Sequence, residues 1–511
     1  MVFVVSLAIA LSFVAWGAFA PASMSATTQA LLSGTIGGFG WFYLLSVFGF
    51  LLFALYLAFG RFGSIRLGGD DAEPEFSRIS WFAMLFSAGM GIGLVFWGAA
   101  EPLAHFATPP AGEGLTADAA RTALRYTFFH WGLHPWAIYS VMGLAIAYFS
   151  FNRGLPALVS EAFRPLFGDR VNGSLGKLVD ILAVIATACG VVTSLGLGTL
   201  QIGGGLTYTL GVPDTDALHI IIIVVAMGLA IISSLSGVGR GIQWLSNLNI
   251  GIATLLLAAL LVFGPTLFIF ESFTTTLGGY INNLSFMSLR LTPFSKGSWV
   301  ADWTLFYWAW WITWAPFVGL FIARVSKGRT IREFVVGVLL APSLVSFLWF
   351  SAFGGTAIHQ QLMEGINLLA VQQQDYAKTL FALLGALPLG HILSVLALAL
   401  IVSFFVTSAD SANLVLGMLS TQGRHDPPAW IKLVWGVVIA AMAIVLLFTG
   451  GLKALQTLSI VSALPFALIM VGLCVSLYKA LADDDRARQH KEKARRHAVD
   501  AMLARDPHLG D

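Results

Sequence analysis

Long apolar runs recur along the whole chain of 511 residues and restrict it to one class of fold. Each run holds about 20 residues, the length that an α-helix needs to cross roughly 30 Å of hydrocarbon. Because lipid offers no hydrogen-bond partners, the backbone of each run must pair within itself, as an α-helix does. We count twelve such runs, starting near residues 1, 41, 79, 122, 177, 217, 247, 299, 333, 388, 430 and 453. The sequence therefore predicts an all-α integral membrane protein with twelve transmembrane helices.

The composition argues against several other classes of protein. Only 11% of the residues are charged and 57% are hydrophobic, whereas a soluble domain carries about 25% charged residues. The formal net charge of +2 gives no reason to expect nucleic acid as a partner. Cys189 and Cys474 both lie in apolar runs, so we expect neither a disulfide framework nor a thiolate metal site. No nucleophile is paired with a base in the sequence, and we therefore expect neither an enzyme nor an organic cofactor.

Basic residues are distributed unevenly among the connections between the expected helices. Most of the 28 Lys and Arg residues fall after even-numbered helices and in the tail. Connections rich in Lys and Arg stay in the cytoplasm, which predicts both termini inside and a location in the cytoplasmic (inner) membrane. We expect residues 1–482 to form one membrane domain whose first helix is retained rather than cleaved as a signal. Residues 483–511 would form a charged tail that either lies on anionic lipid or is solvated.

Five tryptophans occur within residues 303–316, inside the eighth apolar run. Indole faces attract quaternary ammonium cations, and several faces together form a cage for a trimethylated nitrogen. On a helix, Trp308, Trp311 and Trp314 are expected to share one stripe. The alternative is an aromatic belt at the membrane interface, although such belts sit at helix ends. The pattern favours a pathway for a methylated ammonium compound.

Two of the expected helices carry helix-breaking residues at mid-depth. The third contains Gly89, Gly91 and Gly93, which weaken the helix at the bilayer centre and let a headgroup approach closely. Alternate positions lie on different helix faces, so these glycines suit unwinding better than close helix packing, which is the alternative. The eighth contains Pro316, which removes a backbone hydrogen bond from the preceding turn.

The spacing of the two weakened helices divides the chain into two blocks. Residues 79–273 hold helices three to seven, residues 299–482 hold helices eight to twelve, and the first two helices occupy residues 1–78. An odd number of spans per block inverts the second block relative to the first, an arrangement found in secondary transporters. We therefore expect substrate to bind where the two interrupted helices face each other.

The fourth helix brings histidines and aromatic residues together. Trp131 and Tyr139 are eight residues apart, so a continuous helix would place them on nearly one face, as two further walls of a cage. His130 and His134 have the spacing of a metal-binding pair, but no glutamate or third ligand is adjacent in the sequence. We therefore expect these histidines to form hydrogen bonds between helices.

Polar residues interrupt the tenth helix. Thr407, Ser408, Asp410 and Ser411 place a carboxylate and three hydroxyls at a depth where they are costly unless they serve a function. Uncharged oxygen atoms suit a small hard cation, so Thr407 and Ser408 are candidate sodium ligands. The alternative is that the hydroxyls bond their own helix and Asp410 pairs with another helix.

Five motifs of the sequence are distinctive enough to compare with known families. They are GMGIGLVFWGAAEP from Gly89, HWGLHPWAIY from His130, SLGLGTLQIGGG from Ser194, YWAWWITWAPFVGLFIARVSKGRTIREF from Tyr307 and FVTSADSANLVLGM from Phe405. In these motifs the chain resembles the betaine/choline/carnitine transporter family, and the similarity spans essentially all twelve helices. The resemblance implies a fold of the LeuT type, in which helices 3–7 and 8–12 are inverted five-helix repeats preceded by two extra helices. It also implies a homotrimer.

The same resemblance implies roles for single residues. The central ammonium cage would consist of Trp131, Trp136, Tyr139 and Trp311. Three further aromatic residues, Phe306, Trp310 and Trp314, would line the route toward the cytoplasm. A sodium ion would bind the side chains of Thr407 and Ser408 and the backbone carbonyls of Ser87, Met90 and Phe404.

Two positions limit how far the resemblance extends. Some choline carriers of the family have an aspartate where this chain has Gly93, so the cage would lack a local counter-ion and a zwitterion such as glycine betaine fits better. Sodium-coupled relatives carry two threonines one turn apart in the fifth helix, where this chain has Thr187 and Val191, with Thr193 nearby. A second sodium site near Thr187 and Phe317 is therefore doubtful.

The resulting hypothesis is a secondary active transporter that imports glycine betaine or a related quaternary ammonium compound by alternating access, coupled to sodium. The alternatives within transport are proton-coupled choline uptake and exchange of carnitine- or betaine-type substrates. A channel is disfavoured because the sequence offers no ring of pore-lining charges. The short tail of mixed charge leaves osmotic sensing open.

Overall fold

The computed structural model describes residues 1–89, 91–236, 239–294 and 297–505. Over these residues the chain folds into helices, and one isolated antiparallel bridge joins Arg66 to Thr330. The all-α class expected from the apolar runs agrees with this structure.

The first half of the chain holds α1 (Val2–Phe19), α2 (Pro21–Phe59), α3 (Arg78–Gly89), α4 (Ile92–Ala107), α5 (Ala117–Trp131), α6 (Leu133–Ala147), η1 (Tyr148–Asn152), η2 (Glu161–Phe163), α7 (Arg164–Phe167), η3 (Gly168–Asn172), α8 (Ser174–Leu210) and α9 (Asp216–Ser236). The second half holds α10 (Gly239–Phe263), α11 (Thr266–Ser288), η4 (Ala301–Leu305), α12 (Phe306–Val325), α13 (Ile331–Leu362), α14 (Leu368–Gln374), η5 (Tyr376–Lys378), α15 (Thr379–Gly385), α16 (Gly390–Ser420) and α17 (Ala429–Arg505).

In the described part of the chain, nine helices are long and apolar enough to cross a membrane. They are α1, α2, α8, α9, α10, α12 with η4, α13, α16 and α17. The expected third span is divided between α3 and α4, and the expected fourth between α5 and α6. The expected eleventh and twelfth spans both lie in α17, where Gly450 and Gly451 have non-helical backbone angles. The number of twelve crossings stays a prediction.

The glycine-rich stretch of the third apolar run does interrupt its helix. Helix α3 ends at Gly89, and α4 begins at Ile92 after Gly91, whose φ of −157° and ψ of −134° are not helical. A second interruption, which the sequence did not lead us to expect, separates α5 from α6 at Gly132, with φ of −100° and ψ of −131°. Trp131 and Tyr139 therefore do not lie on one continuous helix.

The expected break at Pro316 is wrong. Helix α12 runs from Phe306 to Val325 with Pro316 inside it. The irregular turn of this segment lies earlier, in the π-helical η4 that precedes α12. Packing on all sides holds α12 in a helix although the proline removes one hydrogen bond.

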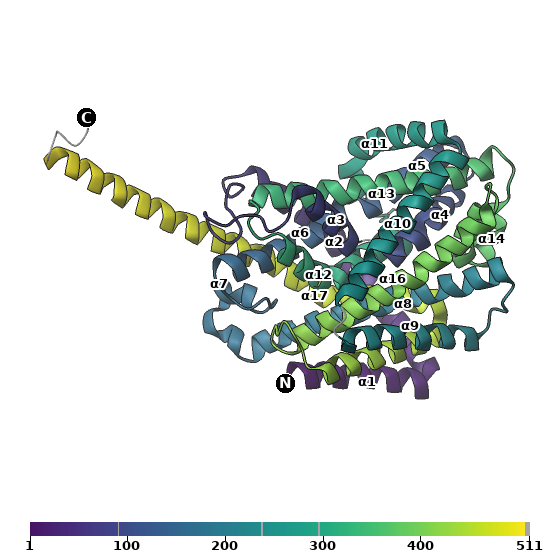
Figure 1. Ribbon diagram of the computed structural model, residues 1–511, viewed down its shortest axis with the longest axis horizontal. Helices are drawn as coiled ribbons and strands as arrows, with labels where there is room; N and C mark the ends of the chain where they lie inside the picture. The colour runs from purple at the N-terminus through teal and green to yellow at the C-terminus, as the bar shows by residue number, and fades with distance from the viewer. Residues whose placement is uncertain (90, 237–238, 295–296, 506–511) are drawn as a thin grey trace.

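Helix α12 lies at the centre of the bundle. In the most apolar stretch of η4 and α12, 89% of the residues are buried, against 22% in α1 and in α10. Helix α12 packs against α6, α8 and α17, and α11 lies at one edge beside α5 (Figure 1). The tryptophans of α12 therefore face protein rather than lipid, which excludes an interfacial belt.

The charged tail continues α17 as a helix to Arg505 and projects away from the bundle (Figure 1). Its first residues are attached to the bundle by polar contacts. Asp484 accepts hydrogen bonds from Arg153, at 2.8 Å for Nη2, and from the Tyr148 hydroxyl. Arg61 lies 3.5 Å from Asp485. These pairs are partly exposed, so each contributes about 1 kcal/mol or less.

Candidate functional site

Four aromatic side chains from three helices meet at the centre of the bundle. The rings of Trp131 on α5 and Trp311 on α12 stand edge to face, with centroids 4.9 Å apart. Tyr139 on α6 lies 6.3 Å from Trp311, and Trp136 lies 5.5 Å from Tyr139. Each of the four is at most 5% exposed. The structure thus brings together the four residues that the family resemblance assigned to the ammonium cage.

The break between α5 and α6 shapes this cluster. Trp131 is the last residue of α5, and Trp136 lies in the first turns of α6 beyond Gly132. A β-carbon at Gly132 would lie 2.6 Å from the Phe128 carbonyl oxygen and 2.7 Å from the ring of Phe347. Glycine is therefore the residue that fits this junction.

A second row of rings continues from the cluster along α12. Phe306 stacks on Trp310 at 5.6 Å, and Trp310 stacks on Trp311 at 4.7 Å. Trp314 follows, with its ring 4.9 Å from that of Phe317. Phe306, Trp310 and Trp311 thus form a stack beside the other rings of the cluster, and Trp314 packs separately on Phe317. Whether substrate passes along these residues stays a prediction.

Hydrogen bonds from the indole nitrogens fix the orientation of the rings on α12. Trp310 Nε1 donates to Ser194 Oγ at 3.1 Å, and Trp314 Nε1 donates to the Gly190 carbonyl at 2.9 Å, both on α8. Trp311 Nε1 donates to the His130 carbonyl at 3.0 Å. The rings are therefore held in place before any ligand binds.

Trp136 differs from these tryptophans. Its indole N–H is buried and has no hydrogen-bond partner among the described residues. A buried donor without a partner is costly, so this group is available to a ligand with an acceptor atom.

Trp308 does not share the position of Trp311, so the expected stripe of three tryptophans is wrong. Trp308 stacks on His134 at 5.2 Å and meets Phe129 edge to face at 5.0 Å. Three residues rotate an α-helix by about 300°, which leaves neighbouring members of the stripe about 60° apart. That angle is enough for Trp308 to pack on Phe129 of α5 and His134 of α6, while Trp311 packs on Trp131 and Tyr139.

Gly93 lies where Trp131 of the cluster converges with Trp310 of the second row of rings. A β-carbon at this position would lie 2.5 Å from Trp310 Cη2 and 3.1 Å from Trp131 Cη2. A side chain at residue 93 would therefore displace an indole. Gly89 ends α3, and its side-chain surroundings are outside the described part of the structure.

One of the expected sodium ligands, Ser408, lies beside the break between α3 and α4. A β-carbon on Gly91 would be 3.6 Å from Ser408 Oγ. Thr407 Oγ1 donates to the carbonyls of Ser403, at 3.0 Å, and Phe404, at 3.2 Å. Its hydroxyl also accepts from Asn249 Nδ2 at 3.3 Å.

The remaining members of the expected sodium site are described incompletely. Ser87 lies in α3, but its side chain is not described, and Met90 lies outside the described residues. The structure thus places Ser408 at the helix break, while Thr407 bonds its own helix. Sodium binding stays a prediction.

The second sodium site gains no direct support from the hydroxyl contacts. Thr187 Oγ1 donates to the Ala183 carbonyl of its own helix at 2.8 Å. Thr193 faces α17, where its hydroxyl lies 2.8 Å from Ser459 Oγ and 3.2 Å from the Leu455 carbonyl oxygen. Phe317 is buried against Trp314.

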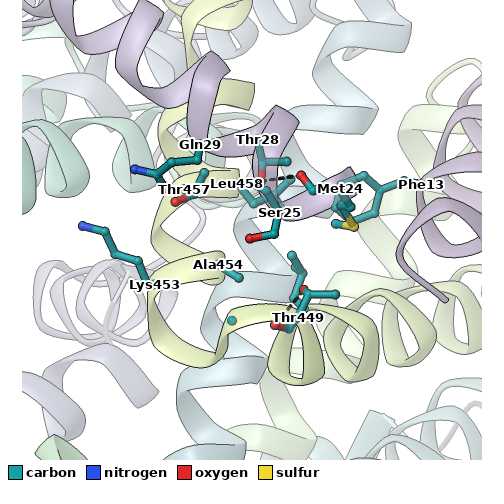
Figure 2. Close-up of a pocket in the computed structure, with 12 residues that line it drawn as sticks. Phe13, Met24, Ser25, Thr28, Gln29, Thr449, Lys453, Ala454, Thr457 and Leu458 are labelled. Carbon is teal, nitrogen blue, oxygen red and sulfur yellow. Dashed lines mark hydrogen bonds between the residues drawn. The ribbon is translucent and has the colours of Figure 1, made fainter. Parts of the chain in front are cut away.

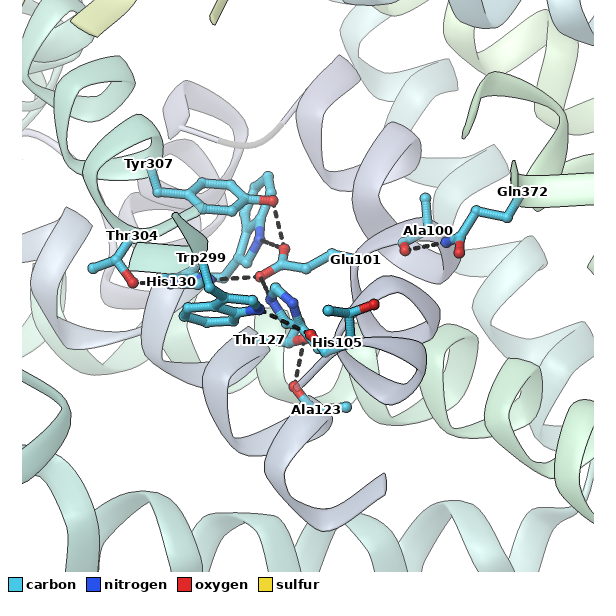
Figure 3. Close-up of polar contacts among 12 residues, drawn as sticks. Ala100, Glu101, His105, Ala123, Thr127, His130, Trp299, Thr304, Tyr307 and Gln372 are labelled. Atoms are coloured by element: carbon cyan, nitrogen blue, oxygen red, sulfur yellow. Dashed lines mark hydrogen bonds and ion pairs between the residues drawn. The ribbon is translucent and has the colours of Figure 1, made fainter. Parts of the chain in front are cut away.

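Glu101, a fully buried carboxylate on α4, was not among the candidate residues chosen from the sequence (Figure 3). Its Oε2 lies 2.7 Å from Trp131 Nε1 and 2.5 Å from the Tyr307 hydroxyl. Its Oε1 lies 2.7 Å from His130 Nδ1 and 3.2 Å from His105 Nε2. A signal was present in the sequence, because an ionisable residue inside an apolar run is a candidate functional residue by default.

The histidines of the fourth apolar run have separate partners. His134 Nε2 lies 2.8 Å from Ser288 Oγ of α11, which confirms the expected hydrogen bond between helices. His130, however, has a glutamate and a further histidine beside it in space, although neither is adjacent to it in the motif from His130. The ligand atoms of Glu101, His105 and His130 lie within 4.8 Å of one another. Because Glu101 Oε1 already joins both imidazoles, we assign hydrogen bonding to this group.

A separate hollow lies between α1, α2 and α17 (Figure 2). Its lining includes Phe13, Met24, Gln29 and Lys453. None of its lining residues belongs to the aromatic cluster. Lys453 also forms an ion pair with Asp302 of η4 at 2.8 Å, so the hollow lies beside the start of the central segment.

Helices of bilayer length around a buried aromatic cluster define a multi-pass membrane protein. A model of the betaine/carnitine/choline family of transporters matches residues 1–486 of the chain. The chain belongs to this family, and it is therefore a transporter and not an enzyme.

Several relatives are similar over nearly the whole chain. The glycine betaine transporter OpuD of Bacillus subtilis is 50% identical, with 96% of each chain covered. An ectoine/hydroxyectoine transporter of Virgibacillus pantothenticus is 45% identical over 96% of this chain and 98% of its own. A glycine betaine transporter of Acinetobacter baylyi is 43% identical over 97% of this chain and 75% of its own.

Proposed function

We propose that this transporter imports glycine betaine, or a closely related quaternary ammonium compound, across the cytoplasmic membrane by alternating access. The observation that carries the proposal is the buried meeting of Trp131, Trp136, Tyr139 and Trp311 from three helices. Indole and phenol faces attract a trimethylammonium group that has lost its water. Two relatives that cover most of the chain are named as glycine betaine transporters.

The cluster also contains a group suited to the other end of a zwitterion. The indole N–H of Trp136, which has no partner among the described residues, is a donor for a carboxylate oxygen. Gly93 keeps a fixed acidic side chain out of the space between Trp131 and Trp310. The Trp136 donor favours glycine betaine over choline, which has no carboxylate; proton-coupled choline uptake or carnitine/betaine exchange is the alternative.

We propose sodium as the coupling ion, bound by the hydroxyls of Thr407 and Ser408 with the carbonyls of Ser87, Met90 and Phe404. The position of Ser408 next to Gly91 supports this site, because a cation there would tie α16 to the broken segment that reaches the cage. Val191 in place of a threonine favours one sodium ion per cycle, so the site of Thr187 and Phe317 is not used in this scheme.

The proposed architecture follows the family. Twelve membrane crossings would include inverted repeats over residues 79–273 and 299–482, preceded by the first two helices in residues 1–78, with both termini in the cytoplasm. Three copies would assemble as a homotrimer. Light scattering of the detergent-purified protein, corrected for bound detergent, tests the assembly, and a monomer would contradict it.

Uptake by purified protein in liposomes tests the function. We expect labelled glycine betaine to accumulate above its outside concentration when an inward sodium gradient is imposed. Accumulation under a proton gradient alone would overturn sodium coupling and favour the choline-type alternative. Competition by unlabelled choline, carnitine and ectoine ranks the substrates, and ectoine is included because one relative is named for it.

A further inference from the structure

Glu101 is the most deeply enclosed carboxylate of the aromatic core. It is 0% exposed, and both of its oxygens meet polar hydrogens from neighbouring side chains (Figure 3). Its partners are two imidazoles, one indole and one phenol. None of these four partners is a lysine or an arginine, so no permanent positive charge neutralises it through these contacts.

The geometry matches an ionised carboxylate. An indole N–H can only donate, so Glu101 Oε2 accepts from Trp131. A carboxylate is an acceptor with room for about four hydrogen bonds, which is the number of contacts here. His130 can donate from Nδ1 to Glu101 while its Nε2 accepts from the Thr304 hydroxyl at 3.0 Å. His105 can donate from Nε2, which leaves both imidazoles neutral and the group with one negative charge.

A buried negative charge at this depth is costly, and four hydrogen bonds offset only part of that cost. A cationic ligand in the cage would neutralise the charge. The Trp131 indole links the carboxylate to the Trp311 ring, because Trp131 bonds Glu101 through Nε1 and faces Trp311 with a centroid distance of 4.9 Å.

The hydrogen bond to Glu101 also changes the cage wall itself. A charge-assisted bond to the indole N–H moves electron density onto the ring, which makes its face more attractive to a cation. Tyr307 bonds the same oxygen, and its ring lies 5.9 Å from Trp311. The carboxylate is thus linked to two of the rings around Trp311.

We propose that Glu101 supplies the negative charge of the ammonium cage, acting through the Trp131 indole N–H, and thereby selects ligands with a positive headgroup. Gly93 consequently does not leave the cage without a counter-charge, as the sequence suggested. Glu101 is a positioning residue in this scheme, because it acts through Trp131 rather than by touching the ligand. The inference rests on the proposed betaine function.

A pair of ligands that differ only in charge tests this role. Glycine betaine and 3,3-dimethylbutanoate have nearly the same shape, but a neutral carbon replaces the ammonium nitrogen in the second. Binding of both to the purified protein is measured by competition against labelled betaine. For the wild type we expect betaine to bind at least about tenfold more tightly than 3,3-dimethylbutanoate, which lacks the positive headgroup.

In Glu101→Gln we expect the preference for betaine over 3,3-dimethylbutanoate to fall by about tenfold. The affinity for 3,3-dimethylbutanoate should stay within about twofold of the wild-type value. Glutamine keeps the shape, and its amide can donate to the two imidazoles, which then accept in their other tautomers. A purely structural role would weaken both ligands equally and leave the preference unchanged, which would overturn the proposal.

Two further variants make the result decisive. Asp180→Asn makes the same chemical change at a buried carboxylate that instead bonds Ser160, and it should leave the preference unchanged. Trp131→Phe keeps a ring but removes the N–H that links it to Glu101, so it should lower the preference even if Glu101→Gln does not fold. In a Trp131→Phe background, Glu101→Gln should add little; a full additional loss would contradict transmission through the indole.

The proposed betaine function and the proposed role of Glu101 can be refuted independently of each other. A wild-type protein that does not bind glycine betaine would refute the proposed function. A wild type that binds betaine, with an unchanged preference in Glu101→Gln, would refute only the role of Glu101.

Discussion

Trp308 and Trp311 lie less than one helical turn apart on α12 but have different neighbours. Trp311 meets Trp131 and Tyr139, whereas Trp308 stacks on His134. Both are buried, so their difference is one of direction rather than depth. At the scale of the residue, the site depends on which face of α12 an indole occupies.

This difference provides a matched pair of variants. We expect Trp311→Leu to weaken binding of glycine betaine by roughly 30-fold, because a desolvated cation–π contact contributes about 2 kcal/mol. Trp308→Leu removes an equally buried indole outside the cage and should change betaine affinity by less than about threefold. Isothermal titration of the purified proteins measures both. Equal losses in the two variants would show that the cage is not where betaine binds.

Gly93 gives a second prediction at this scale. In Gly93→Ala the new methyl group would lie 2.5 Å from Trp310 Cη2, so the indole must move. Overpacking of this kind costs about 1–3 kcal/mol, and we expect a lower thermal midpoint and a raised KM for betaine uptake. Gly228→Ala is the control, because nothing lies within 4 Å of its added β-carbon. An unchanged KM in Gly93→Ala would contradict the close approach of the two rings.

At the scale of the secondary-structure element, the interrupted helices shape the candidate site. The breaks at Gly91 and Gly132 end one helix and begin another beside the cluster, so backbone groups there are not all used within a helix. Helix α12 contributes its aromatic rings from a continuous helix instead. The ligand chemistry and the proposed ion site therefore meet at the break between α3 and α4.

The proposed ion site predicts a change in sodium dependence. We expect Thr407→Ala combined with Ser408→Ala to raise the sodium concentration for half-maximal betaine uptake by about tenfold or more, since two oxygen ligands are lost. Thr254→Ala on α10 is a matched control, because its exposed hydroxyl also bonds its own helix, at 2.7 Å to Ile250. Uptake is measured at constant ionic strength. An identical sodium dependence in the double variant and wild type would remove the site.

At the scale of the whole molecule, the first residues of the tail join it to the bundle. Asp484 bonds Arg153 and Tyr148, and beyond this region α17 projects away from the other helices (Figure 1). Helix α12, which carries the aromatic core, is 89% buried in its most apolar stretch. We therefore expect the core to be independent of the projecting segment.

Truncation tests this division. We expect a chain ending at Gln489 to match the full chain in thermal midpoint and betaine uptake. A chain ending at Asp483 loses the contacts of Asp484 and Asp485, and its stability should fall by about 1 kcal/mol. Fluorescence-detected size-exclusion after heating measures both. Equal destabilisation by the two truncations would show that the projecting helix itself supports the bundle.

The sequence alone determined the all-α membrane class, the glycine break near Gly91 and the residue types of the cage. These follow from local physics, because an apolar run in lipid must be helical and glycines weaken that helix at a known place. The family resemblance supplied Trp131, Trp136, Tyr139 and Trp311 as a set. The periodicity of a single helix did not identify this set, because it assumed that the helix continues through Gly132.

Only the tertiary structure decided how side chains from different helices meet. It turned Trp308 away from the cluster, kept α12 continuous through Pro316 and placed Glu101 against Trp131. Each outcome depends on neighbours far apart in the chain. Packing can stabilise a helix that proline weakens, and a buried carboxylate acquires its role from donors that sequence spacing does not reveal.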